Sequence, residues 1–330
     1  CGSATSWILS NLSRNRGGLY GRLTCEIKLS PFNLKECEDY FKNENIEMSR
    51  YDIVQSYMVF GGIPYYLSYF KKGMSFEGNA DNILFGKNPR LKDEFNRLFN
   101  AIFSNPEDCK KIIRLLAKKH VGFTREEIAK ETGLPFGGGL TDTLNALVES
   151  DFIQRYRPYN VSGKVSFYKL IDNFSLFWLK YVEPNTEDIN FMTDNMTSNI
   201  MRVWRGVAFE EVCWQHIGQI KRALGISGVS SSISAWSVKG NDNKEGVQID
   251  LLIIRNDNVV NLCEMKFAGD IYSIDKEEDA KIRNRIQTLI NTLSPKQSVH
   301  LTMITTYGVS HTMYGGRVQQ QVILDDLFQS

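Results

Sequence analysis

Two apolar stretches near the C-terminal end each carry charged residues that an ordinary buried strand would not tolerate. VQIDLLIIR, residues 247–255, contains Asp250, and VVNLCEMKF, residues 259–267, contains Glu264 and Lys266. The Asn-Asp-Asn turn between them predicts that the two stretches form an antiparallel hairpin. A charge inside an apolar strand is costly to bury unless it is paired or bound to a metal, so the three charges are expected to converge.

The spacing of these charges gives a chemical reason for their types. Glu264 and Lys266 are two residues apart, so alternation along a strand directs both side chains to the same face. Mg²⁺ prefers oxygen ligands and can be held by one or two carboxylates together with water and a substrate phosphate. We therefore expect Asp250 and Glu264 to bind Mg²⁺ or Mn²⁺, and Lys266 to orient the nucleophile or neutralise charge that develops at phosphorus. Glu210, in the preceding apolar helix 206–224, is expected to complete the metal shell or to bind a metal-bound water.

Two interpretations without catalysis remain open. Asp250 and Lys266 could form a cross-strand ion pair with Glu264. A nuclease fold that has lost its activity could also be retained for binding DNA or protein, although an intact set of charges argues against such decay.

Basic and amide side chains follow on the helix predicted over 277–290. They could approach a phosphate backbone, and a solvated charged face is the alternative. The residues concerned are Lys281, Arg283, Arg285 and Gln287.

The order of an Asp, a variable gap and Glu-Met-Lys, preceded by the helix motif GVAFEE, resembles the PD-(D/E)XK nuclease superfamily. The resemblance implies a restriction-endonuclease-like α/β domain with a mixed central sheet. It implies phosphodiester hydrolysis at Asp250, Glu264 and Lys266, and it assigns the acidic role on the helix to Glu210. The sequence departs from the superfamily's name at Ile249, which stands where proline would precede Asp250.

The N-terminal third resembles the second half of an archaeal-type AAA/STAND ATPase module in CGSATSWI, GGLYGRLTCEIKLSPFNLKE and GGIPYYL. The resemblance implies that Ser3 is a sensor, that Arg22 senses phosphate or acts as an arginine finger, and that Gly62 and Pro64 belong to the ATPase lid. From the residues alone, Arg22 is a surface cation and GGIP is a helix stop.

A phosphate-binding loop of the form GxxxxGK[ST] is absent from the 330 residues. No ATPase activity is therefore expected from this chain alone, and ATP is expected as a cofactor only with an N-terminal module upstream of Cys1. The chain is accordingly interpreted as a fragment of a longer ATPase.

The middle of the chain predicts short helices followed by a β-hairpin formed by FIQRYRPY and KVSFYKL. Three helices and a hairpin are the order of a winged helix-turn-helix. The candidate recognition helix, 141–150, contains no Lys or Arg, which favours packing over reading of DNA.

A chain of 330 residues exceeds the roughly 250–300 that usually share one core, so several domains are expected. We predict a partial ATPase with a helical lid remnant over 1–105, a winged helix with a connecting helix over 106–186, and the nuclease-like domain over 187–330. The expected fold class is therefore multidomain α/β.

The amino-acid composition indicates more about the cellular environment of the protein than about its binding partner. Lys and Arg total 39 against 38 Asp and Glu, so the net charge of +1 gives no argument for nucleic acid. The six cysteines show no CxxC spacing, which favours a reducing cytoplasm. The four histidines form no HxxxH pair, so each is expected on the surface or in a core. No stretch of roughly 18–20 apolar residues predicts a membrane helix.

Together these features predict an ATPase-linked, metal-dependent nuclease that acts on nucleic acid, with DNA as the expected substrate and a homo-oligomer as one possible assembly. The alternative is a non-catalytic DNA- or protein-binding regulatory module of a STAND-type ATPase.

Overall fold

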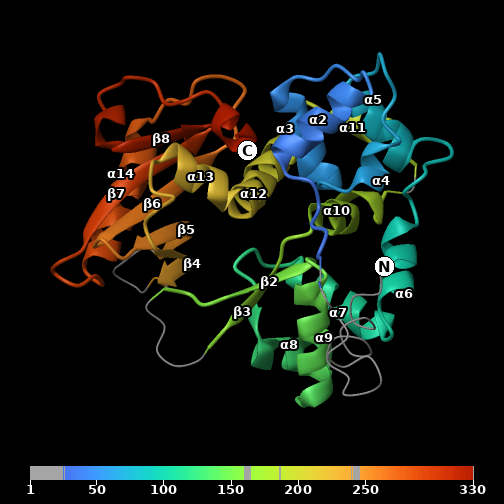
Figure 1. The fold of residues 1–330 in the computed structure, drawn as a ribbon, viewed down its shortest axis with the longest axis horizontal. Coiled ribbons are helices and arrows are strands. Elements are labelled where there is room, and N and C mark those ends of the chain that lie inside the picture. The colour runs from blue at the N-terminus through green and yellow to red at the C-terminus, as the bar shows by residue number, and fades with distance from the viewer. Residues whose placement is uncertain are drawn as a thin grey trace. The chain divides into compact units, whose positions relative to one another are not determined.

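A computed structural model describes residues 25, 27–159, 165–185, 187–238, 240 and 246–329 (Figure 1). Two sequence-predicted residues, Ser3 and Arg22, lie outside the described residues. The chain divides into two compact units, and each is built from separate segments. Unit 1 comprises Cys1–Phe32, Val59–Tyr156 and Ser166–Asp194, and unit 2 comprises Asn33–Met58, Arg157–Val165 and Asn195–Ser330.

Unit 1 is largely helical and has a small antiparallel sheet in the order β1-β3-β2. Its helices are α4 (Pro64–Leu67), α5 (Phe76–Ala80), η2 (Asp81–Phe85), α6 (Glu94–Ile102), α7 (Pro106–Leu116), α8 (Arg125–Thr132), α9 (Gly138–Glu149), α10 (Asn173–Phe177), η3 (Trp178–Val182) and α11 (Phe191–Asn195), the last of which ends one residue beyond the unit. Its strands are β1 (Phe123–Thr124), β2 (Ile153–Tyr156) and β3 (Phe167–Leu170). The predicted order of three helices and a hairpin is present in α7, α8, α9, β2 and β3, and β1 is an additional strand.

Unit 2 is a mixed α/β structure around a five-stranded sheet in the order β4-β5-β6-β7-β8. The strands are β4 (Ser231–Val238), β5 (Val247–Arg255), β6 (Val259–Lys266), β7 (Ser298–Thr305) and β8 (Gln320–Ile323). The helices are α2 (Leu34–Asn43), α3 (Arg50–Phe60), α12 (Asn199–Gln215), α13 (Ile217–Ala223), α14 (Lys276–Ile290) and the short 3₁₀ segments η4 (Gly315–Arg317) and η5 (Leu324–Phe328); α3 continues two residues past the unit.

The sheet of unit 2 is mixed, as expected. β4, β5 and β6 pair antiparallel, whereas β6, β7 and β8 pair parallel. Parallel neighbours need a crossover connection, and α14 supplies it between β6 and β7. The carboxyl ends of the three parallel strands therefore lie at one edge of the sheet, and α14 begins near that edge.

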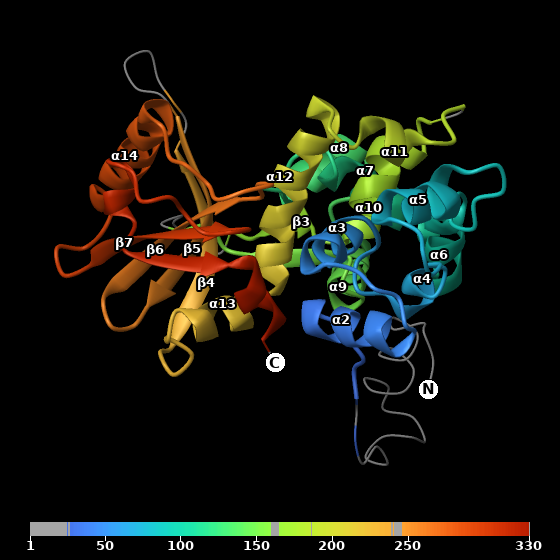
Figure 2. The same cartoon turned by 90° about the horizontal axis from the view of Figure 1, so that it is seen from above.

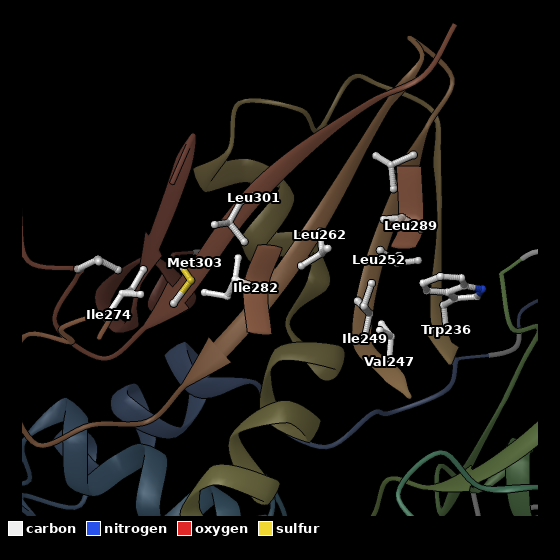
Figure 3. Close-up of a cluster of buried hydrophobic side chains, with 12 residues drawn as sticks. Trp236, Val247, Ile249, Leu252, Leu262, Ile274, Ile282, Leu289, Leu301 and Met303 are labelled. Atoms are coloured by element: carbon white, nitrogen blue, oxygen red, sulfur yellow. The ribbon is translucent and has the colours of Figure 1, made fainter. Parts of the chain in front are cut away.

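The core of unit 2 fills the space between the sheet and α14. Ile282 and Leu289, seven residues apart and so on one face of α14, pack with Leu252 of β5, Leu262 of β6 and Leu301 of β7 (Figure 3). The helix α12 lies on the opposite face of the sheet and contacts β6 (Figure 2). Both faces are covered, which explains why β5 and β6 are nearly continuous apolar runs.

A buried histidine joins the start of α2 to α12 within unit 2. The backbone N–H of Leu34 donates to His216 Nε2 at 3.0 Å, so the proton of the neutral ring is on Nδ1, which lies 2.8 Å from the Val212 carbonyl oxygen. Burial lowers the pKa of His216 to about 4, and its bond to Val212 opposes that shift only in part. His216 is thus a core histidine, one of the two places predicted for it.

The division into two units does not follow the order of the chain, because residues 33–58 pack in unit 2 with its C-terminal segment. The three-part division at 105 and 186 stays a prediction. No helix of the described residues is both long and apolar enough to cross a bilayer. The cysteines that the structure describes are free thiols.

Candidate active site

Four charged side chains from β6 and α14 meet at the carboxyl end of β6. The Lys266 ammonium lies 3.0 Å from Glu264 Oε1 and 2.9 Å from Glu278 Oε1. Arg285 Nη1 donates to the other oxygen of Glu264, Oε2, at 2.9 Å. The ion pairs link the four side chains in the order Arg285–Glu264–Lys266–Glu278, with positive and negative charges alternating. We call this group the β6–α14 charge cluster.

Local structure explains why these four residues meet. Glu264 and Lys266 project from the same face of β6, the one that also carries Leu262 and is covered by α14. Glu278 and Arg285 are seven residues apart, or two turns, so they lie on one flank of α14. Asp275 caps that helix by accepting from the Glu278 backbone N–H at 2.8 Å.

The side chains of the charge cluster are partly buried, and the neighbouring carboxylates fix the protonation state of the lysine. The side chains of Glu264, Lys266, Glu278 and Arg285 are 13%, 27%, 16% and 25% exposed. Burial lowers the pKa of Lys266, but the carboxylates of Glu264 and Glu278 outweigh it and raise that pKa well above its usual value. Lys266 therefore remains an ammonium at neutral pH, suited to stabilising negative charge and not to acting as a base.

Asp250 lies at the same end of the hairpin but outside the charge cluster. The β5–β6 pairing ends with Leu251 opposite Cys263, which leaves Asp250 and Glu264 as the next residues of their strands. Among the described residues, Asp250 forms a hydrogen bond or ion pair with neither Glu264 nor Lys266; its Oδ1 accepts from Gln248 Nε2 at 2.6 Å. The cross-strand ion pair considered from the sequence is therefore not formed between Asp250 and Lys266.

A β-bulge accompanies this position of Asp250. Ser234 of β4 pairs with Leu252, whereas Trp236 pairs with Ile249, so Asp250 and Leu251 together face the one residue between those on β4. A bulge bends its strand and redirects a side chain relative to simple alternation. Side-chain alternation along β5 therefore does not by itself determine whether the Asp250 side chain points toward that of Glu264.

The two acidic residues of α12 differ in burial. Glu211 is 1% exposed, whereas Glu210, the residue that the resemblance singles out, is partly exposed. Among the described residues, no three His, Cys, Asp or Glu side chains form a group that could hold a metal ion. A shell of Glu210, Asp250 and Glu264 is thus not assembled in this structure, and metal binding stays a proposal.

Glu278 was not among the residues singled out from the sequence, and Arg285 was considered only as a possible phosphate contact. The signal that could have found Glu278 is its two-turn spacing from Arg285, opposite in charge, on an amphipathic helix that follows Glu264 and Lys266.

The turn containing Gly62 and Pro64 has a structural explanation in unit 1. The Phe32 backbone N–H donates to the Gly62 carbonyl at 2.7 Å, and a Cβ on Gly62 would lie 1.8 Å from the Phe32 carbonyl oxygen. Pro64 occupies the first turn of α4, where a missing N–H costs nothing. Close backbone approach and helix initiation account for both residues, and their predicted role in nucleotide binding stays a prediction.

Comparison with known proteins adds one relative. No family model matches the chain. The chain is 27% identical over 262 residues to the uncharacterized protein MJECL04 of Methanocaldococcus jannaschii, an alignment that covers 78% of this chain and 56% of that protein. The chain thus spans little more than half the length of this curated relative.

Proposed function

We propose that unit 2 is a nuclease-type α/β domain of the PD-(D/E)XK kind that hydrolyses phosphodiester bonds of nucleic acid with Mg²⁺ or Mn²⁺. The observation that supports this proposal is the β6–α14 charge cluster, which brings Glu264 and Lys266 together at the carboxyl end of β6, while Asp250 lies on β5 just past the last β5–β6 pair. The preceding helix, hairpin and mixed sheet agree with the architecture that the resemblance implies.

The donor chemistry fits a magnesium ion held by two carboxylates. Asp250 and Glu264 provide carboxylate oxygens, and Mg²⁺ usually takes one or two such ligands with water and phosphate oxygens. When bound, the ion would supply a Lewis acid that stabilises negative charge on phosphate. Glu210 would support this shell from α12.

The chain's own residues have distinct tasks in this proposal. The Lys266 ammonium stabilises charge that develops on the phosphate in the transition state, because a fixed cation in a partly buried site interacts more strongly than one in water. Glu278 positions that ammonium from α14. Arg285 holds the Glu264 carboxylate on the side away from Lys266.

The proposal extends to the rest of the chain as the sequence predicted. The segment α7 to β3 would form a winged helix, and residues 1–105 would derive from an archaeal-type AAA/STAND ATPase with its lid, so that the nuclease-type domain works with an ATP-driven module. Nucleotide binding by such a module would require a phosphate-binding loop that the 330 residues do not contain.

One observation favours a second candidate, a regulatory module that binds nucleic acid or protein without cutting. Both oxygens of Glu264 already have cationic partners, Lys266 and Arg285, which is also the arrangement of a purely structural ion-pair network.

Metal dependence separates the two candidates. We expect purified protein to cut labelled single- or double-stranded DNA or RNA with Mg²⁺ or Mn²⁺ and to stop when EDTA removes the metal, because the ion stabilises the charge on phosphorus. Titration of the metal by calorimetry provides a second measurement. The absence of both cleavage and metal binding contradicts the nuclease and supports the regulatory module, whereas cleavage unaffected by EDTA contradicts the metal dependence.

A further inference from the structure

Two exposed arginines of unit 2 share one buried carboxylate. Asp279, on the first turn of α14, is 4% exposed at its side chain. Arg283 Nε lies 3.1 Å from its Oδ2, and Arg317 Nε lies 2.9 Å from its Oδ1. Arg283 is one turn further along the same helix, whereas Arg317 ends η4 in the connection between β7 and β8.

The charge balance of this group leaves one positive charge in excess. A single arginine would neutralise the buried Asp279 carboxylate, and the structure provides two, each about half exposed at 52% and 51% of the side chain. Each guanidinium contacts Asp279 through Nε, so its two terminal Nη groups remain as further donors. Two such forks can bind a phosphate with several charge-assisted hydrogen bonds.

Its position relates the group to the charge cluster. Asp279 directly follows Glu278, whose carboxylate meets Lys266, so consecutive residues of α14 belong to the two groups. Arg317 ends η4, three residues before β8 begins, and its guanidinium reaches Asp279 on the first turn of α14, which starts near the edge of the sheet where β6 ends with Lys266. A nucleic-acid strand with one phosphate at Lys266 would continue along this edge.

We infer that Arg283 and Arg317, held in place by Asp279, bind a backbone phosphate of the nucleic acid beside the one at the charge cluster. The inference rests on the proposed function for its ligand class. Asp279 is a positioning residue: it restricts two long side chains before the ligand arrives, which reduces the entropy that binding costs. We call the three residues the arginine clamp.

Binding measured without metal tests the arginine clamp apart from cleavage. Fluorescence anisotropy of a labelled single-stranded oligonucleotide in EDTA is compared for the wild type, Arg283→Gln, Arg317→Gln and the double variant. Arg202→Gln is the matched control, because Arg202 is an exposed arginine of α12 that pairs with Asn199 and loses the same charge. Thermal unfolding of each variant shows whether it folds.

We expect each clamp substitution to weaken binding by about tenfold, or about 1.4 kcal/mol, because each removes a hydrogen bond to a charged group. For the double variant, the slope of log affinity against log salt should fall by about 0.7, as expected when one phosphate contact on a single strand is lost. A folded double variant that binds the oligonucleotide as tightly as Arg202→Gln overturns the inference and leaves the arginines as a tie between α14 and the β7–β8 connection.

Two further arms separate the possible explanations. Asp279→Asn removes a negative charge and so raises the net charge by one. Electrostatics alone would then tighten oligonucleotide binding, whereas loss of the positioning of the two arginines would weaken it. Tighter binding overturns the positioning role of Asp279. Inorganic phosphate is titrated in parallel. If the double variant loses phosphate binding but keeps oligonucleotide binding, the group is a site for a free anion and the inference is overturned.

Failure of the inference and failure of the proposed function give different results. Oligonucleotide binding that depends on the arginines, without cleavage under any metal condition, contradicts the nuclease and supports the clamp. Metal-dependent cleavage with binding unaffected by the double substitution contradicts the clamp and supports the nuclease.

Discussion

Lys266→Met is expected to slow metal-dependent cleavage by about a hundredfold or more, because removal of one preorganised charge donor from a transition state has effects of that size. Methionine keeps the unbranched apolar stem and removes only the ammonium. Glu264 and Glu278 would then lose the cation between them. We also expect the variant to lose about 1–3 kcal/mol of stability at neutral pH, the usual contribution of a hydrogen bond to a charged group.

The rate is measured under single-turnover conditions with excess protein, and stability by urea unfolding. Lys276→Met is the matched control, since Lys276 is exposed on the first turn of the same helix, α14. A folded Lys266→Met protein that cuts as fast as the control contradicts the catalytic role of the ammonium.

Unit 2 should lose about 3 kcal/mol of stability as the pH falls from 6.5 to about 4, owing to His216. In the native state its Nε2 accepts the Leu34 N–H, so a proton there would place two donors against each other. Burial lowers the pKa of His216 to about 4, against 6.5 for a free histidine. The unfolded chain takes up the proton first, so stability is full above 6.5 and declines as the pH falls, at about 1.4 kcal/mol per pKa unit of difference.

Urea unfolding of wild type and His216→Gln between pH 4 and 7.5 measures this contribution. The variant should be less stable at pH 7.5, because it loses the bond to Val212, and the difference between the two proteins should narrow on acidification. Subtraction is needed because Glu38, whose pKa is lowered to about 2 by Arg50 and Lys42 against the opposing effect of burial, adds its own acid dependence below about 4.5. A difference that stays constant with pH contradicts the tautomer assigned to His216.

Short-range features of the sequence account for where helices start and end. Asn33 with Glu36 and Thr124 with Glu127 form the reciprocal caps that start α2 and α8. Gly133 ends α8 in the left-handed conformation. The two residues of each cap are three positions apart, and Gly133 lies nine positions after Thr124. Caps and left-handed glycines therefore depend only on nearby sequence.

The hairpin and the shared face of Glu264 and Lys266 were also predictable. Period-two alternation specifies a face wherever pairing is regular, and β6 is regular along its length. The same rule could not be applied to Asp250, because the bulge at that position depends on how β4 pairs with β5 and is not encoded in β5 alone.

Long-range contacts were beyond the sequence. The pairing of Lys266 with Glu278 depends on how α14 crosses the sheet between β6 and β7. The packing of residues 33–58 in unit 2 likewise depends on a contact between Leu34 and His216, 182 positions apart. Propensity and periodicity describe single elements, whereas these contacts depend on how elements pack.

The single-turnover cleavage rate of Glu264→Gln beside Glu277→Gln, in Mg²⁺ or Mn²⁺ and with the substrate fully bound, shows whether Glu264 holds a catalytic metal. Glutamine keeps the shape of the side chain and removes the charge that would hold the metal, and Glu277 is an exposed glutamate of α14 that serves as control. If Glu264 holds a catalytic metal, the rate is about 100- to 1000-fold lower for Glu264→Gln and unchanged for Glu277→Gln. Equal rates for the two folded variants would contradict it.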